Sequence, residues 1–561
     1  MYALRSGKTI PINFRGERKV LNQEYLRAMD DEILKDVYFY HNKISDKIDL
    51  YTVGCEISEW DGEKIARILN TEDLDEEIIV FNTCAVTGLA QIGSEKVAER
   101  LVKLYPNKKI YFVGCGVNYN KEFYEKLGIA IPNADKFKHN SYNCKSKNTD
   151  YNFTLNNRRE AGLVKIEDGC YHNCTYCIIH KIREHYVVPY EKIHRQIRTL
   201  LDQGKTVIQL LGTEISLYNS DGMDLTALCK RVLADFPEIE YLVMGAIDPA
   251  SKQVDSLIEL IKHEPRMGNK LYLCTQSCSD TILKAMGRRH NVARLREIKK
   301  LAGDDVFLIL QLIIGFPGET DELFQETLDY IKETKPIDYD TIPFSRRKGT
   351  PAYDMPNQIP TDVIYKRERI IYDTIKEYTH ENDFGSERAF DRYEKGQIIA
   401  FNEFRPKNLD KCVVFHEDLY DTDNLIKLFK ILPEYDNDER DIVIITNFDT
   451  ERDKYDLDVN VKLLTMTFGV KVITKVTIND KFVNFISNTY YSITNFSYRI
   501  GMYVEFDFAP LISSSGEQII NLFKMIRDNN LDDIESMTRN LIKSGNKKFL
   551  KAIVKNFNVS I

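Results

Sequence analysis

Residues 162–177 read GLVKIEDGCYHNCTYC and connect a short apolar run to three closely spaced cysteines. The alternation of Val164 and Ile166 predicts a β-strand that ends in a cysteine-bearing loop. We call these cysteines the compact triad: Cys170, Cys174 and Cys177. Thiolates are the ligands of iron–sulfur clusters, and three of them on a [4Fe–4S] cube leave one iron open to chelate a small molecule. The CxxxCxxC spacing therefore predicts a redox enzyme.

Two other interpretations of the compact triad are a zinc site that lacks a fourth ligand and a set of buried free cysteines. Structural zinc sites favour paired CxxC spacing, or CxxC followed by HxxxH. His172 and His180 flank the triad, but neither completes such a pair. The clustering of three cysteines directly after Gly169 is also unusual for buried free thiols. The spacing thus favours an iron–sulfur cluster over both alternatives.

A second set of cysteines, the dispersed triad, follows three short apolar runs. The runs are KIDLYTVGC, EEIIVFNTC and KKIYFVGC, which end at Cys55, Cys84 and Cys115. Helical patterns follow at residues 59–69, 93–105 and 120–127. Repeated strand–helix units predict a parallel sheet with the cysteines at the carboxyl ends of strands, where open α/β sheets bind ligands. A lone cysteine there would be a buried core residue, but three equivalent placements favour shared ligation.

Six segments of the chain, in this order, resemble the radical S-adenosylmethionine (SAM) methylthiotransferase family, whose members add a methylthio group to tRNA adenosines or to a ribosomal protein. The segments are TVGCEISEWDGE, VFNTCAVTGLA, GCYHNCTYCII, CTQSCSD, IIGFPGET and FSRRKGTPA. The resemblance covers residues 47 to 385. Two positions depart from the family pattern, because Cys278 and Glu184 each stand where the family has glycine.

The resemblance implies two [4Fe–4S] clusters and SAM as cofactors. The compact triad is the implied catalytic set, since its cluster chelates SAM, whose reductive cleavage yields a 5′-deoxyadenosyl radical. The cluster of the dispersed triad holds the sulfur that becomes the methylthio group, and a second SAM supplies the methyl. Such an enzyme needs a sulfur donor and an electron donor such as flavodoxin or ferredoxin.

Several residues at predicted strand ends are candidates to bind SAM. Glu214 occupies the region of the family's Gly-Gly-Glu-type element, in which the glycine pair is reduced to Gly212. The full set is Tyr176, Glu214, Gln276, Ser277, Gly315 and Gly318. The glycines would let the backbone approach the adenine closely. The alternatives are a solvated loop carboxylate for Glu214, packing for Tyr176 and an ordinary turn for the glycines.

Four cationic side chains are candidate substrate-binding residues: Arg183, Arg346, Arg347 and Lys348. Arg183 aligns with the arginine of the family's ARG segment. The other three form a basic knot suited to a carboxylate or phosphate, with a solvated surface run as the alternative. CTYCII and IPFSRRKGTPA most resemble the branch that acts on N6-threonylcarbamoyladenosine 37 in the anticodon loop of tRNA. The resemblance thus implies methylthiolation at C2 of this carboxylate-bearing nucleoside.

Other substrates remain open at this point, namely isopentenyladenosine 37 of tRNA and a ribosomal protein. An alternative from another class is a noncatalytic iron–sulfur or zinc protein that binds RNA or a protein partner. The formal net charge of −8 does not by itself favour RNA, so RNA binding requires a locally basic face. Residues 416–458 are acidic and would repel RNA.

The organisation expected from the sequence is α/β. We expect an N-terminal extension, a parallel-sheet methylthiotransferase domain, a linker, a radical SAM domain built as a partial (β/α) barrel, a β-rich region that is a candidate RNA-binding module, and a helical segment. The corresponding ranges are 1–46, 47–131, 132–158, 159–390, 395–510 and 511–561. The β-rich region is expected to include VKLLTMTF, residues 461–468, as a strand.

Composition agrees with a multidomain intracellular enzyme. A chain of 561 residues with 43% apolar residues exceeds one core and has enough apolar surface for several. No apolar run approaches the ~20 residues of a membrane span, and the first residues lack the apolar stretch of a signal peptide. Eleven cysteines without a secretory signal argue against a disulfide framework. We therefore expect a cytoplasmic protein with no membrane association.

Overall fold

The computed structural model divides the chain into two compact units, residues 1–388 and 389–561. The structure describes residues 11–14, 17–20, 38–70, 76–142, 161–268, 270–336, 338–379, 409, 412–435, 438, 440–452, 454–477, 481 and 503–507. In the first unit, the hairpin strands β1 (Pro11–Phe14) and β2 (Glu17–Val20) pair with each other in antiparallel fashion. The expected helical segment at 511–561 and most of the expected linker lie outside the described residues.

The N-terminal sheet has the parallel arrangement that the sequence predicts. Its described strands lie in the order β3 (Tyr38–Ser45), β4 (Ile48–Gly54), β5 (Ile78–Thr83), β6 (Lys109–Gly114), β7 (Ile129–Ala130). Strands β4 to β7 are parallel, and only β3 runs antiparallel to its neighbour in the described sheet. Every residue of β5 is buried, as expected for a strand covered on both faces.

Helices connect these strands where the apolar period changes from two to 3.6. They are α2 (Glu56–Leu69), α3 (Gly88–Leu104), α4 (Cys115–Tyr119) and α5 (Lys121–Leu127). The side chain of Thr87 caps α3 by accepting a hydrogen bond from the backbone N–H of Ala90. A turn of 3-10 helix, η2 (His139–Tyr142), buries Tyr142 in the core between α2 and the sheet.

The part of the first unit that follows residue 161 contains two parallel sheets, which order their described strands as β8–β11–β14 and β15–β16–β17. Their bounds are β8 (Gly162–Lys165), β11 (Val207–Leu211), β14 (Tyr241–Met244), β15 (Lys270–Gln276), β16 (Phe307–Ile314) and β17 (Asp338–Pro343). Parallel bridges from Leu242 to Met267 and from Ile247 to Leu273 join the two sheets. The expected partial barrel is therefore confirmed.

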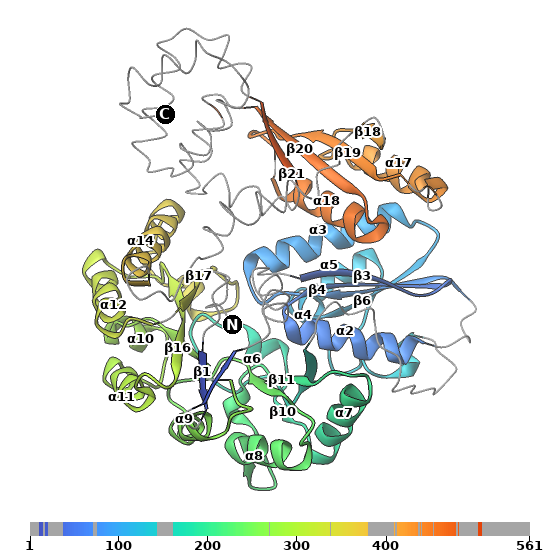
Figure 1. Ribbon diagram of the computed structural model, residues 1–561. Coiled ribbons are helices and arrows are strands. Elements are labelled where there is room, and N and C mark those ends of the chain that lie inside the picture. Colours follow the sequence, from blue (N-terminus) through green and yellow to red (C-terminus); the bar gives the residue numbers. More distant parts are fainter. Residues whose placement is uncertain are drawn as a thin grey trace. The chain divides into compact units, whose positions relative to one another are not determined.

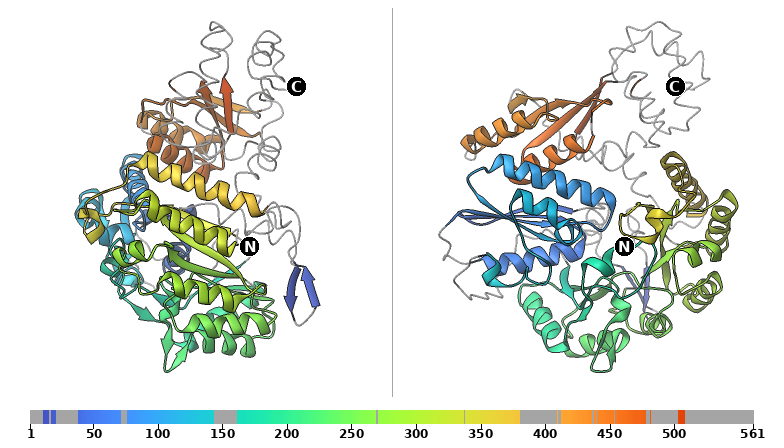
Figure 2. Two further views of the ribbon diagram at one scale, coloured as in Figure 1. Left: turned by 90° about the vertical axis from the view of Figure 1, so that its left-hand side faces the viewer. Right: turned by 180° about the vertical axis from the view of Figure 1, so that it is seen from behind.

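Helices cover the outside of this partial barrel, as Figures 1 and 2 show from three sides. The longer ones are α7 (Tyr190–Asp202), α8 (Leu225–Asp235), α9 (Gln253–His263), α11 (Val292–Ala302), α12 (Asp321–Thr334) and α14 (Thr361–Thr379). Short elements are β9 (Glu167–Asp168), α6 (Ile179–Ile182), β10 (Tyr186–Val187), η3 (Ile215–Leu217), β12 (Asn219–Ser220), β13 (Met223–Asp224), α10 (Asp280–Ala285) and α13 (Pro351–Asp354). One large apolar core lies between helices and strands.

Hydrogen bonds attach the N-terminal sheet to the barrel within the first unit. Trp60 Nε1 of α2 donates to Gln196 Oε1 of α7 over 3.1 Å. Gln209 Nε2 of β11 donates to Glu56 Oε2, at the start of α2, over 2.9 Å. Helix α2 follows Cys55 directly, so these contacts fix one end of the dispersed triad against the barrel.

The described C-terminal unit is an α/β structure, which corrects the expectation of a β-rich region. Its strands pair in parallel in the order β18 (Val413–His416), β19 (Ile442–Asn447), β20 (Lys471–Thr477), β21 (Tyr503–Asp507). The helical elements are α17 (Thr422–Ile431), η6 (Leu432–Tyr435) and α18 (Lys454–Phe468). Strand–helix–strand connections replace the antiparallel hairpins that an all-β module would need.

The predicted strand at residues 461–468 is wrong, because this segment is the second half of α18. Leu457, Val461 and Leu464 are fully buried at a spacing of four and three residues. That is the helical period, and it becomes visible only when the residues before 461 are included. Among the described helices of the whole chain, none has the length and apolarity needed to cross a bilayer.

Candidate active site

The dispersed triad lies at the carboxyl ends of three adjacent parallel strands. Cys55, Cys84 and Cys115 directly follow β4, β5 and β6. A Cβ atom built on Gly54 would lie 3.0 Å from Cys84 Cβ, so the chain before Cys55 approaches Cys84 closely. Burial raises the pKa of Cys84, and the negative charges of Cys55 and Cys115 raise it further. The fold therefore gathers three thiols that are separated by about thirty residues in sequence.

The compact triad lies in the loop that follows β9. Burial raises the pKa of Cys170 to about 12, and the nearby charges of Cys177 and Cys174 contribute. Burial likewise raises the pKa of Cys177 to about 11. A tight turn shapes the loop, because the backbone N–H of Cys177 donates to the carbonyl of Cys174 over 3.1 Å. Binding a cluster would displace protons from these thiols.

The two triads border the same apolar cluster. Its buried members are Ala85, Cys115, Ile178, Ile179 and Ile182, and it packs against the partly buried Tyr119, Cys170 and Cys177. Cys115 belongs to the dispersed triad, whereas Cys170 and Cys177 belong to the compact one. The two cysteine sites therefore border one small apolar cluster, which places them close enough to take part in one reaction.

The donor chemistry of each triad fits an iron–sulfur cluster. In the described parts of the chain, no three or more His, Cys, Asp or Glu side chains are arranged to hold one metal ion. The thiolates of a cubane cluster bind different iron atoms, so they need a wider spread than ligands of a single ion. Each triad would supply soft ligands to all but one iron of such a cube.

Beside Cys174 lies a cavity of about 300 Å³ that is rich in charged groups. It is lined by Tyr171, His172, Asn173, Cys174, Asp248, Gly287, Arg288 and Arg289. Asp248 is almost fully buried and forms ion pairs with Arg288 over 2.9 Å and with Arg289 over 2.8 Å. Arg288 also donates to Cys174 Sγ over 3.4 Å. The sequence analysis missed Asp248, whose only local signal was its place just past a strand.

Two of the predicted SAM-binding residues in this region, Glu214 and Gln276, carry polar side chains that could hydrogen-bond a ligand. Glu214 is buried, and its Oε1 accepts hydrogen bonds from the Ser216 hydroxyl and from the backbone N–H of Asp248. Burial raises its pKa, and the charge of Asp248 adds to the effect. Gln276 has a φ of 66° and a buried Oε1 without a hydrogen-bond partner in the described structure. Such strain is typical of functional positions.

The remaining predicted cofactor residues line the strand ends of the barrel. Ser277 is buried beside Gln276. Tyr176 packs edge-on against Phe316, with ring centroids 6.4 Å apart. Gly315 and Gly318 adopt φ values of 80° and 85°, which favour glycine. Cys278, which replaces a family glycine, is buried in the main core.

The basic knot predicted to bind substrate is split by the structure. Arg347 is buried, and its Nη2 donates to the carbonyl of Ala85 over 2.7 Å. Its guanidinium also lies over the ring of Tyr119, 4.5 Å from the centroid. Arg346 and Lys348 are exposed. Only these two cations of the knot are therefore accessible to a substrate.

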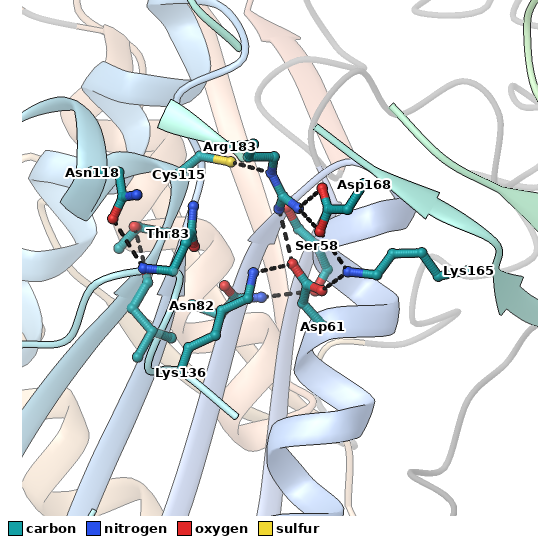
Figure 3. A network of polar contacts seen from close by, with 12 residues as sticks. Ser58, Asp61, Asn82, Thr83, Cys115, Asn118, Lys136, Lys165, Asp168 and Arg183 are labelled. Atoms are coloured by element: carbon teal, nitrogen blue, oxygen red, sulfur yellow. Dashed lines mark hydrogen bonds and ion pairs between the residues drawn. The ribbon is translucent and has the colours of Figure 1, made fainter. Parts of the chain in front are cut away.

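Arg183, which the sequence predicts to bind substrate, is also buried. Its Nε donates to Cys115 Sγ over 2.9 Å. Its Nη1 donates to both oxygens of Asp168, and its Nη2 donates to Asp61 Oδ2 over 2.8 Å. Figure 3 shows the guanidinium between the sulfur and the two carboxylates. Arg183 thus acts inside the protein, next to the dispersed triad.

Two buried lysines complete the polar network around Arg183. Lys165 Nζ donates to Asp61 Oδ1 over 2.8 Å and to Asp168 Oδ2 over 2.7 Å, and Lys136 Nζ pairs with Asp61. Burial opposes ionisation of Asp61, but the three cations hold its pKa well below the usual range. Sequence reasoning missed this network. Its local signals were a lysine within the apolar run GLVK and an aspartate on the buried face of α2.

Comparison with known families gives two matches. Residues 164–331 match the radical SAM superfamily. Residues 47–132 match a family described as "Uncharacterized protein family UPF0004". The first range contains the compact triad and the second contains the dispersed triad.

Similar proteins carry methylthiotransferase names. One from Rickettsia prowazekii (strain Madrid E), "Threonylcarbamoyladenosine tRNA methylthiotransferase MtaB", is 30% identical over 58% of this chain and 81% of its own length. One from Clostridium botulinum (strain Langeland / NCTC 10281 / Type F), "tRNA-2-methylthio-N(6)-dimethylallyladenosine synthase", is 30% identical over 58% of this chain and 80% of its own length.

Solved structures include that of the radical SAM methyltransferase TsrM from Kitasatospora setae, which is 12% identical, has a TM-score of 0.39 and covers 53% of this chain and 69% of that one. The radical SAM superfamily implies SAM and a [4Fe–4S] cluster as cofactors. By its sequence relatives, this chain belongs to the radical SAM methylthiotransferase family and is a transferase.

Proposed function

We propose that the protein is a tRNA methylthiotransferase that adds a methylthio group at C2 of N6-threonylcarbamoyladenosine 37 in the anticodon loop. The observation that carries this proposal is the shared apolar cluster of the two triads. Methylthiolation needs radical generation and sulfur delivery at one carbon, so the two sites must lie close together. The names of the bacterial relatives support tRNA as the substrate.

In this proposal the compact triad binds the cluster that meets SAM, and the dispersed triad binds a second [4Fe–4S] cluster. When bound, a cluster with an open iron supplies the electron for reductive cleavage of SAM. The chain itself orients SAM. Glu214 and Gln276 offer carboxylate and amide oxygens at strand ends, and Ser277 offers a hydroxyl. Gly318 leaves room for the adenine beside the backbone, since no heavy atom of the described residues beyond its chain neighbours lies within 4 Å of its Cβ position, whereas Ile364 fills that space at Gly315.

The segment 344–349 links both triads and presents the accessible cations. Ser345 Oγ accepts a hydrogen bond over 2.8 Å from the backbone N–H of Gly88, the first residue of α3, four residues after Cys84. Lys181 Nζ donates to the carbonyl of Gly349, which ties the segment to the region after Cys177. The exposed Arg346 and Lys348 therefore lie next to the contact between the triads. They suit the carboxylate of the threonylcarbamoyl group.

The reaction also needs an electron donor, for which we propose a flavodoxin or ferredoxin, and a sulfur donor. We place it in the cytoplasm. The described cysteines are all free thiols, which fits a reducing compartment.

A second candidate substrate is isopentenyladenosine 37 of tRNA. The Clostridium botulinum relative named for this type of nucleoside is as similar to the chain, at 30% identity, as the Rickettsia protein. That nucleoside lacks a carboxylate, so it leaves Arg346 and Lys348 without a matching anion.

Mass spectrometry of nucleosides tests the proposal. The protein, reconstituted anaerobically, is incubated with SAM, sulfide, a reductant and tRNA carrying either threonylcarbamoyladenosine or isopentenyladenosine. A methylthio adduct on the first nucleoside is expected. An adduct on isopentenyladenosine alone would contradict the substrate, and 5′-deoxyadenosine release without any tRNA adduct would point to a protein substrate. No SAM cleavage at all would favour a noncatalytic protein.

A further inference from the structure

The buried network around Arg183 contains more positive than negative groups. Its cations are Lys136, Lys165 and Arg183, and its carboxylates are Asp61 and Asp168. All five side chains are buried. Burial lowers the pKa of Lys136, whereas a guanidinium stays charged in proteins. Arg183 is therefore the permanent cation of the network, and a buried charge is stable only when it is paired.

Cys115 Sγ is the sulfur that Arg183 contacts. It accepts a hydrogen bond from Arg183 Nε over 2.9 Å, while the other two nitrogens of the guanidinium are held by carboxylates. The planar guanidinium offers donors along two edges, so it can bind carboxylates on one side and sulfur on the other. In the proposed cluster this sulfur is an iron ligand, so the guanidinium donates to a ligand sulfur.

The geometry of the network also ties the two cysteine sites together. Asp168 lies two residues before Cys170, in the strand that leads to the compact triad. Asp61 lies on α2, whose first turn follows Cys55. Arg183 contacts both carboxylates and Cys115 at once, so its position depends on elements from both sites (Figure 3).

We propose that Arg183 is a positioning residue that fixes Cys115 and raises the reduction potential of the cluster bound by the dispersed triad, through its N–H···S hydrogen bond. This inference rests on the proposed second cluster. The step concerned is the gain of one electron by that cluster from the proposed electron donor, with no bond made or broken at Arg183. Reduction makes the cluster more negative, so a donor aimed at a ligand sulfur stabilises the reduced form.

Redox titration of a protein that holds only this cluster tests the proposal. The background protein is the triple variant Cys170→Ala, Cys174→Ala and Cys177→Ala. The midpoint potential for reduction of its remaining cluster is measured by electron paramagnetic resonance (EPR). Arg183→Lys keeps the positive charge but cannot bind both carboxylates and also reach the sulfur through Nε. We expect its midpoint to shift to a more negative potential. An unchanged midpoint would overturn the proposal.

Arg347→Lys is the matched control. Arg347 is also buried near the dispersed triad, but its described hydrogen bonds go to Ala85 and Gln91 rather than to sulfur. The midpoint potential of the cluster in the Arg347→Lys variant should stay close to that in the background protein. An equal shift in both variants would contradict a specific role for the Arg183 hydrogen bond.

A second measurement does not depend on a folded Arg183 variant. The background protein is labelled with ¹⁵N-arginine, and pulsed EPR of the reduced cluster records nitrogen hyperfine coupling. A coupling from arginine is expected, and its absence would overturn the hydrogen bond. If the background protein binds no iron on reconstitution, the second cluster of the proposed function is contradicted, and the role of Arg183 with it. If the cluster forms but shows no coupling to arginine, only the Arg183 contact is contradicted.

Discussion

Arg347 Nη2 lies 2.7 Å from the carbonyl oxygen of Ala85, a residue 262 positions earlier in the chain. The contact joins the basic segment 344–349 to the loop that directly follows Cys84. It removes Arg347 from the surface and leaves Arg346 and Lys348 exposed beside it. One basic run in the sequence therefore has two different roles in the structure.

Charge reversal at the two exposed positions should change substrate preference. With Arg346→Glu and Lys348→Glu combined, we expect kcat/KM for tRNA carrying threonylcarbamoyladenosine to fall by about 10- to 100-fold, the value of one charge-assisted hydrogen bond. Activity on tRNA with isopentenyladenosine, which has no carboxylate, should fall much less. The value of kcat/KM is measured for each tRNA separately, and the methylthio product is quantified by nucleoside mass spectrometry.

Arg347→Lys serves as the comparison for this pair. Arg347 is buried and is not exposed to a substrate, so any change in activity should be similar for the two tRNAs. Equal losses for both tRNAs in the Arg346 and Lys348 variant would refute carboxylate recognition by these cations.

Removing one cysteine from each triad should affect two different steps of the reaction. Cys174→Ala should abolish SAM cleavage, because the compact triad would keep only two thiol ligands. Cys84→Ala should preserve release of 5′-deoxyadenosine but block the methylthio product. Chromatography of SAM products and mass spectrometry of tRNA nucleosides report the two steps. Full methylthiolation by Cys84→Ala would exclude the dispersed triad from sulfur delivery.

The buried network should contribute strongly to stability. Lys165 is fully buried between Asp61 and Asp168, so Lys165→Met removes one cationic hydrogen-bond donor from each buried carboxylate and leaves Asp168 with Arg183 as its remaining described ion-pair partner. We expect a loss of about 3 kcal/mol in the free energy of unfolding. The denaturant midpoint followed by circular dichroism measures it.

An exposed ion pair provides the matched control for Lys165. Arg198 Nη1 lies 2.8 Å from Glu238 Oε1 at the surface. Arg198→Met should leave the denaturant midpoint unchanged, since solvent screens exposed pairs. A midpoint equal to wild type in Lys165→Met would show that the network contributes little to folding.

Glu167 should make stability depend on pH. Burial raises the pKa of Glu167 to about 8 from 4.5, although a hydrogen bond from the backbone N–H of Glu214 opposes the shift. The folded protein therefore binds a proton that the unfolded chain releases above pH ~4.5. This contribution is fully present below pH ~4.5 and is lost as pH rises towards 8; it is on the order of 5 kcal/mol at most.

Glu167→Gln removes the titrating group and keeps its shape. Denaturant unfolding at several pH values between 5 and 8.5 compares the variant with wild type. Wild type should lose more stability than Glu167→Gln across this window. Parallel curves would show that Glu167 does not titrate there.

The sequence by itself determined the local elements and the placement of the cysteines. Cys55, Cys84 and Cys115 follow β-strands in a parallel sheet as predicted, because apolar periodicity and helix signals are local properties of the chain. Within the described residues, the second half of α18 was predicted as a strand, because a window of eight residues was too short to show the helical period.

Only the tertiary structure decided how the charged residues are used. Arg183 meets Asp61 across 122 residues of sequence, and Lys165 meets Asp61 across 104. Arg183 and Arg347 looked like substrate-binding cations, yet both are buried. A charged side chain is expected at the surface when only the sequence is known. Its ion-pair partner depends on which distant elements pack together. Burial and pairing are properties of the packed fold, so no local pattern reports them.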